Sequence, residues 1–121
     1  LTLAQISRHT LALYAGASSG HNPIHIDSDF AKKAGMPDVF AHGMLSMAYL
    51  GRMLTDWQPQ SKLLKFSNKF SSITELKDVI TCSGKVVEII ESDVEKLARC
   101  EIQAAKACGE QTLVGEALVA L

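Results

Sequence analysis

The chain has 121 residues, 47% of them hydrophobic and 21% charged, which is enough for one globular domain with a real core and predicts a single domain over residues 1–121. The formal net charge of -1 excludes a general electrostatic attraction to nucleic acid or to an anionic membrane surface. No apolar run approaches the roughly 18 residues that a membrane span needs, and the amino terminus lacks a signal-peptide pattern, so we expect a cytoplasmic protein.

The cysteines give no sign of a disulfide framework or a zinc site. Cys82, Cys100 and Cys108 are odd in number, lie in apolar or alternating surroundings and lack CxxC spacing. We therefore expect three reduced thiols that fill space.

The start of the chain predicts a helix followed by a loop. Residues 1–15 place apolar side chains near helical spacing, and Thr2 with Gln5 three residues later matches a capping box. This pattern predicts a helix that begins almost at residue 1. Residues 16–23 (GASSGHNP) then concentrate small, polar and turn-forming residues, which predicts a short structured loop.

Two further helices are predicted before the strands. Asp27 can cap a short helix over residues 28–34, which a Gly-Met-Pro turn at residues 35–37 would end. Residues 41–57 are almost entirely apolar, with few polar positions around the circumference. This pattern is typical of a core helix that is covered on several sides.

The second half of the chain predicts a meander of antiparallel strands. Alternating apolar and polar positions and turn-like breaks support strands over residues 62–71, 78–90, 94–107 and 111–121. Residues 94–107 also contain helix-favouring residues. We predict a strand there because Gly109 allows a tight connection to the strand over residues 111–121. Helices followed by strands predict the α+β class, with one curved sheet around a central helix.

The histidine-containing islands GHNPIH (residues 20–25) and AHGML (residues 41–45) resemble the signature of the MaoC-like dehydratase family. The likeness extends over about forty residues, which is far more specific than a short motif. The closing stretch GEQTLVGEALVAL is also similar to the last strand of the family. The positions that match the signature are Asn22, Pro23, His25, Asp27, Phe30, Ala31, Gly35, Ala41, His42, Gly43 and Met44.

The resemblance implies a hotdog fold, in which an antiparallel sheet wraps around a long central helix, and an (R)-specific enoyl-CoA hydratase or 3-hydroxyacyl-thioester dehydratase activity in fatty acid metabolism. The substrate would be a trans-2-enoyl or (R)-3-hydroxyacyl group on CoA or acyl carrier protein. The resemblance implies no cofactor and no metal. It also implies a strand before the first helix, and no such strand is predicted from residue 1 onward.

The sequence departs from the family at the catalytic carboxylate. Counted back from Asn22 without a gap, the family's aspartate falls on Gly20. A one-residue deletion would put His21 there instead, but the unbroken spacing from Tyr14 to Asn22 favours Gly20, and His21 is then an exposed loop residue by default. A single remaining acid/base group predicts a slow enzyme or an inactive one.

The resemblance assigns roles to the matching residues. His25 would be the acid/base group, and the amide of Gly43 at the start of the helix would stabilise the enolate oxygen, as unpaired first-turn amides can. Asn22 would hold the loop or the attacking water. The substrate would contact Gly20, His21 and Ser46. His42 is predicted to be structural, and a metal site at the loop histidines has no convincing further ligand.

Two other functions stay open. A catalytically impaired acyl-thioester-binding subunit that needs a partner chain would explain the missing carboxylate. A hotdog thioesterase fits less well, because those enzymes lack the Asn-Pro-x-His island. In each case a short sheet leaves an unpaired edge, so we expect a two-fold dimer, either a homodimer or a heterodimer.

Overall fold

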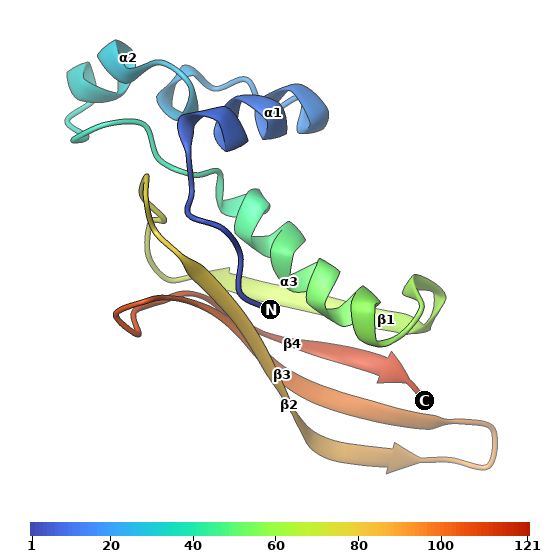
Figure 1. Ribbon diagram of the computed structural model, residues 1–121. Helices are drawn as coiled ribbons and strands as arrows, with labels where there is room; N and C mark the ends of the chain where they lie inside the picture. Colours follow the sequence, from blue (N-terminus) through green and yellow to red (C-terminus); the bar gives the residue numbers. More distant parts are fainter.

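The computed structural model describes residues 1–121 and confirms the α+β class, with the helices before the sheet (Figure 1). An antiparallel four-stranded sheet has the order β1-β4-β3-β2, and its strands curve below the longest helix. Its elements are α1 (Arg8–Ser18), the 3-10 turn η1 (Pro23–His25), α2 (Ser28–Lys33), α3 (Gly43–Trp57), the 3-10 turn η2 (Gln60–Lys62), β1 (Leu63–Phe70), β2 (Ile80–Glu91), β3 (Lys96–Lys106) and β4 (Gln111–Ala120).

The prediction of a simple meander over the second half was wrong for β1. Strands β2, β3 and β4 do follow one another through tight turns, and Gly109 has φ +94 in the second turn, as a glycine tolerates. β1 instead pairs with β4. The connection after β1 does not turn back, because it pairs with the segment before α3, where the amide of Ala41 donates to the carbonyl of Thr74 at 2.8 Å.

The prediction of a helix from residue 1 was also wrong. Residues 1–6 are extended and run along the edge of β2, with hydrogen bonds that include Leu3 N to Ile80 O at 3.0 Å and Cys82 N to Leu1 O at 2.7 Å. The helix begins at Arg8, and its N-cap is Ser7, whose hydroxyl accepts from the third amide along. Backbone groups at the edge of β2 therefore outweigh the weak capping-box pattern nearer the start.

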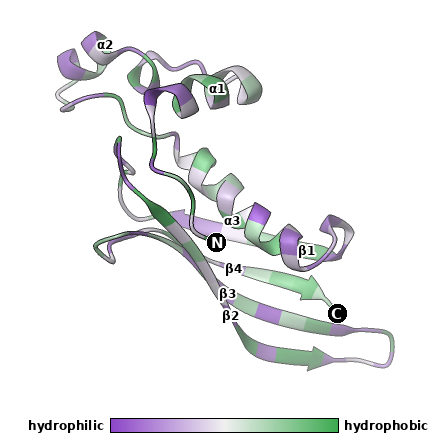
Figure 2. Cartoon of the chain, viewed as in Figure 1, coloured by the Kyte–Doolittle hydropathy of each residue, from purple (hydrophilic) through white to green (hydrophobic).

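Helix α3 packs on the sheet through one face, whereas a helix covered on several sides had been predicted. Leu50 and Leu54 are buried with apolar residues of β2, β3 and β4 in the larger core, whereas Met44 and Trp57 are 55% and 45% exposed. Strands β2 and β4 are largely hydrophobic, while β1 and α2 are more polar (Figure 2). Beyond its first turns, the other faces of α3 are open in the single chain.

A second, smaller core joins α1, α2 and the start of α3 at one end of the molecule (Figure 1). Leu11, Ala31, Val39 and Leu45 are buried there, and Tyr49 packs against both cores. This core fixes the loops on either side of α2 against the first turn of α3. No helix of the chain is long and apolar enough to cross a membrane.

Candidate functional site

A cavity of about 440 Å³ lies where α1, the loop around η1 and the first turn of α3 meet. Two imidazoles and a helix start face it, but no carboxylate, lysine or arginine does. A base and hydrogen-bond donors are therefore available in one place, without a carboxylate as a second acid/base group. The residues that line it are Tyr14, Ser18, Gly20, His25, His42, Gly43 and Met44.

His25 is presented by a short capped turn. Asn22 is the N-cap of η1, and its side chain accepts a hydrogen bond from Ile24 N at 3.1 Å. Nδ1 of His25 lies 2.8 Å from the carbonyl oxygen of Phe40, which can only accept, so Nδ1 carries the proton and Nε2 of the neutral ring has a free lone pair. Burial lowers the pKa of His25, and His42 lowers it further, although the bond to Phe40 opposes them. His25 is therefore a neutral base at pH 7.

His42 lies against His25, a contact that the sequence reasoning missed. The two rings stack with centroids 4.0 Å apart and 26° between their planes, and Tyr14 meets His42 edge-on at 4.9 Å. His42 is only 7% exposed, and its Nε2 donates to the carbonyl of Gly20 at 2.8 Å. The AHG island in the sequence was a signal for this residue, but its position at a helix start favoured a packing role.

The start of α3 supplies free donors. The amides of Gly43 and Met44 have no hydrogen-bond partner in the structure, and His42, the N-cap, makes no side-chain capping bond. Unpaired first-turn amides and the helix dipole both favour negative charge at this end. The first turn of α3 can therefore stabilise an oxyanion beside His25.

An aromatic ring lies against Gly43. A Cβ on Gly43 would lie 2.8 Å from Cε1 of Phe70, which comes from the end of β1 and is 58% exposed. Gly43 also lines a second cavity of about 290 Å³, together with Ser46 and Thr112. The predicted substrate residue Ser46 is 3% exposed and lines this second cavity but not the first, whereas Gly43 lines both.

The structure brings only some of the predicted site residues together. Gly20, His25 and Gly43 line one cavity. Asn22 and His21 are exposed and do not line it. Asn22 holds the turn that presents His25, which is one of the two roles predicted for it.

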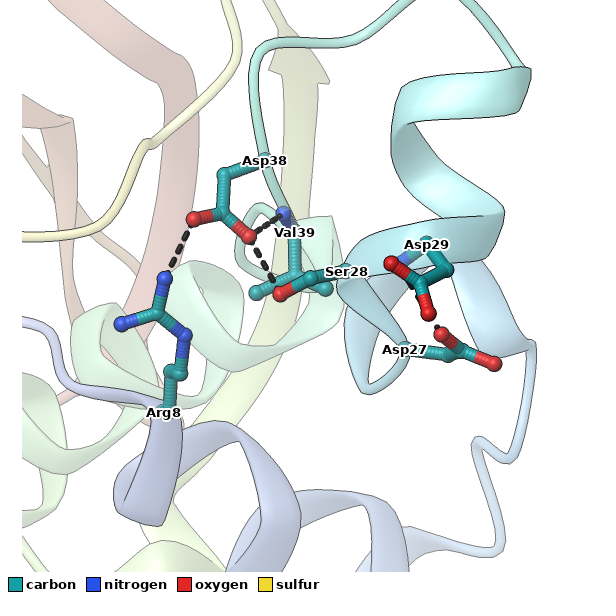
Figure 3. A network of polar contacts seen from close by, with 6 residues as sticks. All are labelled: Arg8, Asp27, Ser28, Asp29, Asp38 and Val39. Carbon is teal, nitrogen blue, oxygen red and sulfur yellow. Dashed lines mark hydrogen bonds and ion pairs between the residues drawn. The ribbon is translucent and has the colours of Figure 1, made fainter.

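A polar network holds the segment that leads to Phe40 (Figure 3). The carboxylate of Asp38 accepts from the Ser28 hydroxyl at 2.6 Å and from Val39 N at 2.7 Å, and it also pairs with the Arg8 guanidinium. The bond from Ser28 is the main reason that the pKa of Asp38 is lowered. The network joins the first residues of α1 and α2 to the segment whose carbonyl orients His25. The sequence reasoning missed Asp38, and no motif indicated it.

Comparison with known proteins places the chain in a family. The sequence model described as the MaoC like domain matches residues 2–106. An (R)-specific enoyl-CoA hydratase of Rhodospirillum rubrum is 28% identical over 87 residues, which are 70% of this chain and 60% of the relative. The chain therefore matches less than two thirds of the length of that relative.

Solved structures agree on the fold. The chain is similar to the (R)-hydratase from A. caviae involved in PHA biosynthesis, with TM-score 0.88, 24% identity and coverage of 100% of this chain and 91% of the other. It is similar to the R-hydratase PhaJ1 from Pseudomonas aeruginosa, with TM-score 0.86, 26% identity and coverage of 98% and 76%. A further similar structure is the ChsH1-ChsH2 complex from Mycobacterium tuberculosis, with TM-score 0.84, 19% identity and coverage of 100% and 91%.

The fold is therefore the hotdog fold that the resemblance implied. The family's sequence model covers most of the chain, and the two motif islands that carried the resemblance lie within the matched residues. This protein belongs to the MaoC-like domain family.

Proposed function

We propose that this protein is a hydro-lyase that adds water to trans-2-enoyl thioesters, or removes it from (R)-3-hydroxyacyl thioesters, carried on CoA or acyl carrier protein. One observation supports this above all: the free lone pair of His25 and the unpaired amides at the start of α3 belong to residues that line the same cavity. A base and an oxyanion donor on one thioester are what this reaction requires.

The reaction follows from these groups. Nε2 of His25 takes a proton from water as the water oxygen bonds to the β-carbon of the enoyl group. The electron pair of the double bond moves toward the thioester carbonyl, and the amide of Gly43 donates to the oxygen that becomes negative. The proton then passes from His25 to the α-carbon, so water is added in full and the base is restored. Dehydration is the reverse.

The absence of a carboxylate at Gly20 sets the expected rate. One positioned acid/base group typically contributes on the order of 10² to 10⁴ in rate, and a site with a single group lacks that second contribution. We expect measurable but slow hydration. Gly20 still has a role, because its carbonyl holds His42 beside the base.

A crotonyl-CoA hydration assay on the purified protein tests the proposal. The His25→Ala variant is expected to lose activity by at least about 100-fold, since it removes the base. His9→Ala is the matched control, because His9 is exposed at the start of α1 and does not line the cavity. Equal activity of the His25→Ala variant and the unmodified protein would remove His25 from the mechanism.

The second candidate is an acyl-thioester-binding subunit that works with a catalytic partner chain. The cavity without a carboxylate favours it. The similarity to a complex of two chains, ChsH1-ChsH2, is in keeping with such a partnership, and a homodimer or heterodimer would use the free sheet edge at β1. High hydration activity of the purified protein alone would exclude this candidate, whereas acyl-CoA binding in calorimetry without turnover would support it.

A further inference from the structure

His25 and His42 form a pair whose hydrogen bonds are both set by carbonyl oxygens. Nδ1 of His25 faces the carbonyl of Phe40, and Nε2 of His42 faces the carbonyl of Gly20, each at 2.8 Å. Carbonyl oxygens only accept, so each neutral ring has its proton on that nitrogen. The pair therefore has fixed and opposite tautomers, with Nε2 free on His25 and Nδ1 free on His42.

The surroundings give the histidine pair no counter-charge. Nδ1 of His42 is buried and has no hydrogen-bond partner. The groups that face the pair are Tyr14 from α1, Ser18 and Gly20 from the loop, and the first turn of α3. None of them is a carboxylate or a cation, so no counter-charge offsets a second proton.

We propose that His42 is a positioning residue of the acid/base site, which fixes the ring of His25 by stacking on it while it holds the loop at Gly20. The proposal rests on the proposed function for the reaction that it serves, but the contacts themselves are independent of any substrate. His42 acts through His25, since its own free nitrogen is buried.

This arrangement changes the sign of the electrostatic effect on the base. A carboxylate neighbour would favour the protonated form of His25, whereas a second imidazole 4.0 Å away disfavours it, because two protons on the pair would place like charges side by side. The proton that His25 takes from water is then readily returned to the α-carbon. The site would remain active at lower pH than a site with a carboxylate beside its histidine.

An NMR titration of the histidine ring nitrogens tests the proposal without substrate. His42→Phe keeps a flat ring against His25 but cannot take a proton or bond to Gly20. His42→Gln keeps a donor for the Gly20 carbonyl but removes the stacked ring. In both variants the pKa of His25 is expected to rise, and the low-pH limb of the kcat profile is expected to move to higher pH with it. His9→Phe, at an exposed position, is the matched control.

The outcomes separate the two proposals. If the pKa of His25 is unchanged in both folded variants, the positioning role of His42 is wrong, whether or not the enzyme is active. If the pKa rises but the unmodified protein has no hydration activity, the histidine pair stands and the hydro-lyase assignment fails. Circular dichroism identifies a variant that does not fold, and the more conservative His42→Gln then decides.

Discussion

Restoring a carboxylate at Gly20 is the most direct perturbation of this site. Gly20→Asp would place an acid group beside two imidazoles, in a cavity that has no other acid. Its backbone is not in the left-handed region, so an aspartate can adopt the same conformation. The variant therefore adds chemistry without backbone strain.

The structure also sets the steric cost of this substitution. A Cβ on Gly20 would lie 3.1 Å from Oγ of Ser18 and 3.1 Å from Cδ2 of His42. Both neighbours are tied, because Ser18 donates to the carbonyl of Tyr14 at 2.7 Å and His42 donates to the carbonyl of Gly20. A shift of a few tenths of an ångström is needed, and we expect it to lower the free energy of unfolding by about 1 kcal/mol.

The chemical gain should exceed that cost. A second acid/base group contributes on the order of 10² to 10⁴ in rate, which is about 3 to 5 kcal/mol of barrier. The steric cost acts on the folded fraction, not on the turnover of folded protein. We therefore expect Gly20→Asp to raise kcat for crotonyl-CoA hydration by at least about 100-fold, despite a lower Tm.

Two matched variants complete the experiment. Gly20→Ala adds the same Cβ without a carboxylate, and Gly20→Asn adds the same shape without the charge. Both are expected to lower Tm as the aspartate does and to leave kcat at or below its original value. A rate for Gly20→Asp that matches the alanine and asparagine variants, with all three folded, would refute the reasoning.

Three further predictions concern stability and reactivity. Gly115→Ala should lower the free energy of unfolding in urea by about 3 kcal/mol or more, since its Cβ would lie 2.1 Å from a backbone oxygen of β1. Gly16→Ala in α1, where nothing lies within 4 Å of the added Cβ, should raise the free energy of unfolding by up to about 1 kcal/mol. An equal loss of stability in the two variants would show that the clash at Gly115 is not the cause. Asp38→Asn should lower Tm at pH 7, and the difference in Tm should vanish at acid pH. The pKa of Asp38 is lower in the folded protein than in the unfolded chain, so its charge stabilises the fold above the unfolded pKa, and this stabilisation is lost as pH falls through the folded pKa. A Tm difference that persists at acid pH would exclude the charge as its source. Iodoacetamide should modify exposed Cys108 well before buried Cys82, whose thiol pKa is raised by burial. Mass spectrometry measures the order of modification, and earlier modification of Cys82 would contradict the prediction.

Most elements of the fold could be predicted because each rests on a local period or a cap. Asp27 caps α2 as expected, and its side chain accepts from two amides of the first turn. The strand over Lys96–Lys106 was predicted despite its helix-favouring residues, because Gly109 indicated the hairpin. Such signals act within a few residues and need no tertiary contact.

The errors in the fold arise where distant backbone groups compete with local patterns. Residues 1–6 match a helix start in sequence but pair with β2, about eighty residues away, and nothing near Thr2 indicates that edge. The placement of β1 beside β4 is equally non-local. Local propensity is a weak prior that tertiary context overrides.

By itself, the amino-acid sequence determined the family, the α+β class, the acid/base candidate His25 and the glycine in place of an acid, because these follow from residue types at fixed spacing. Only the tertiary structure decided that His42 stacks on His25, that Ser46 faces a different cavity, and that Asp38 holds the segment that orients the base. The physical reason is that ring stacking, cavity walls and shared carboxylate bonds join groups far apart in the chain, and their geometry exists only once both cores have packed.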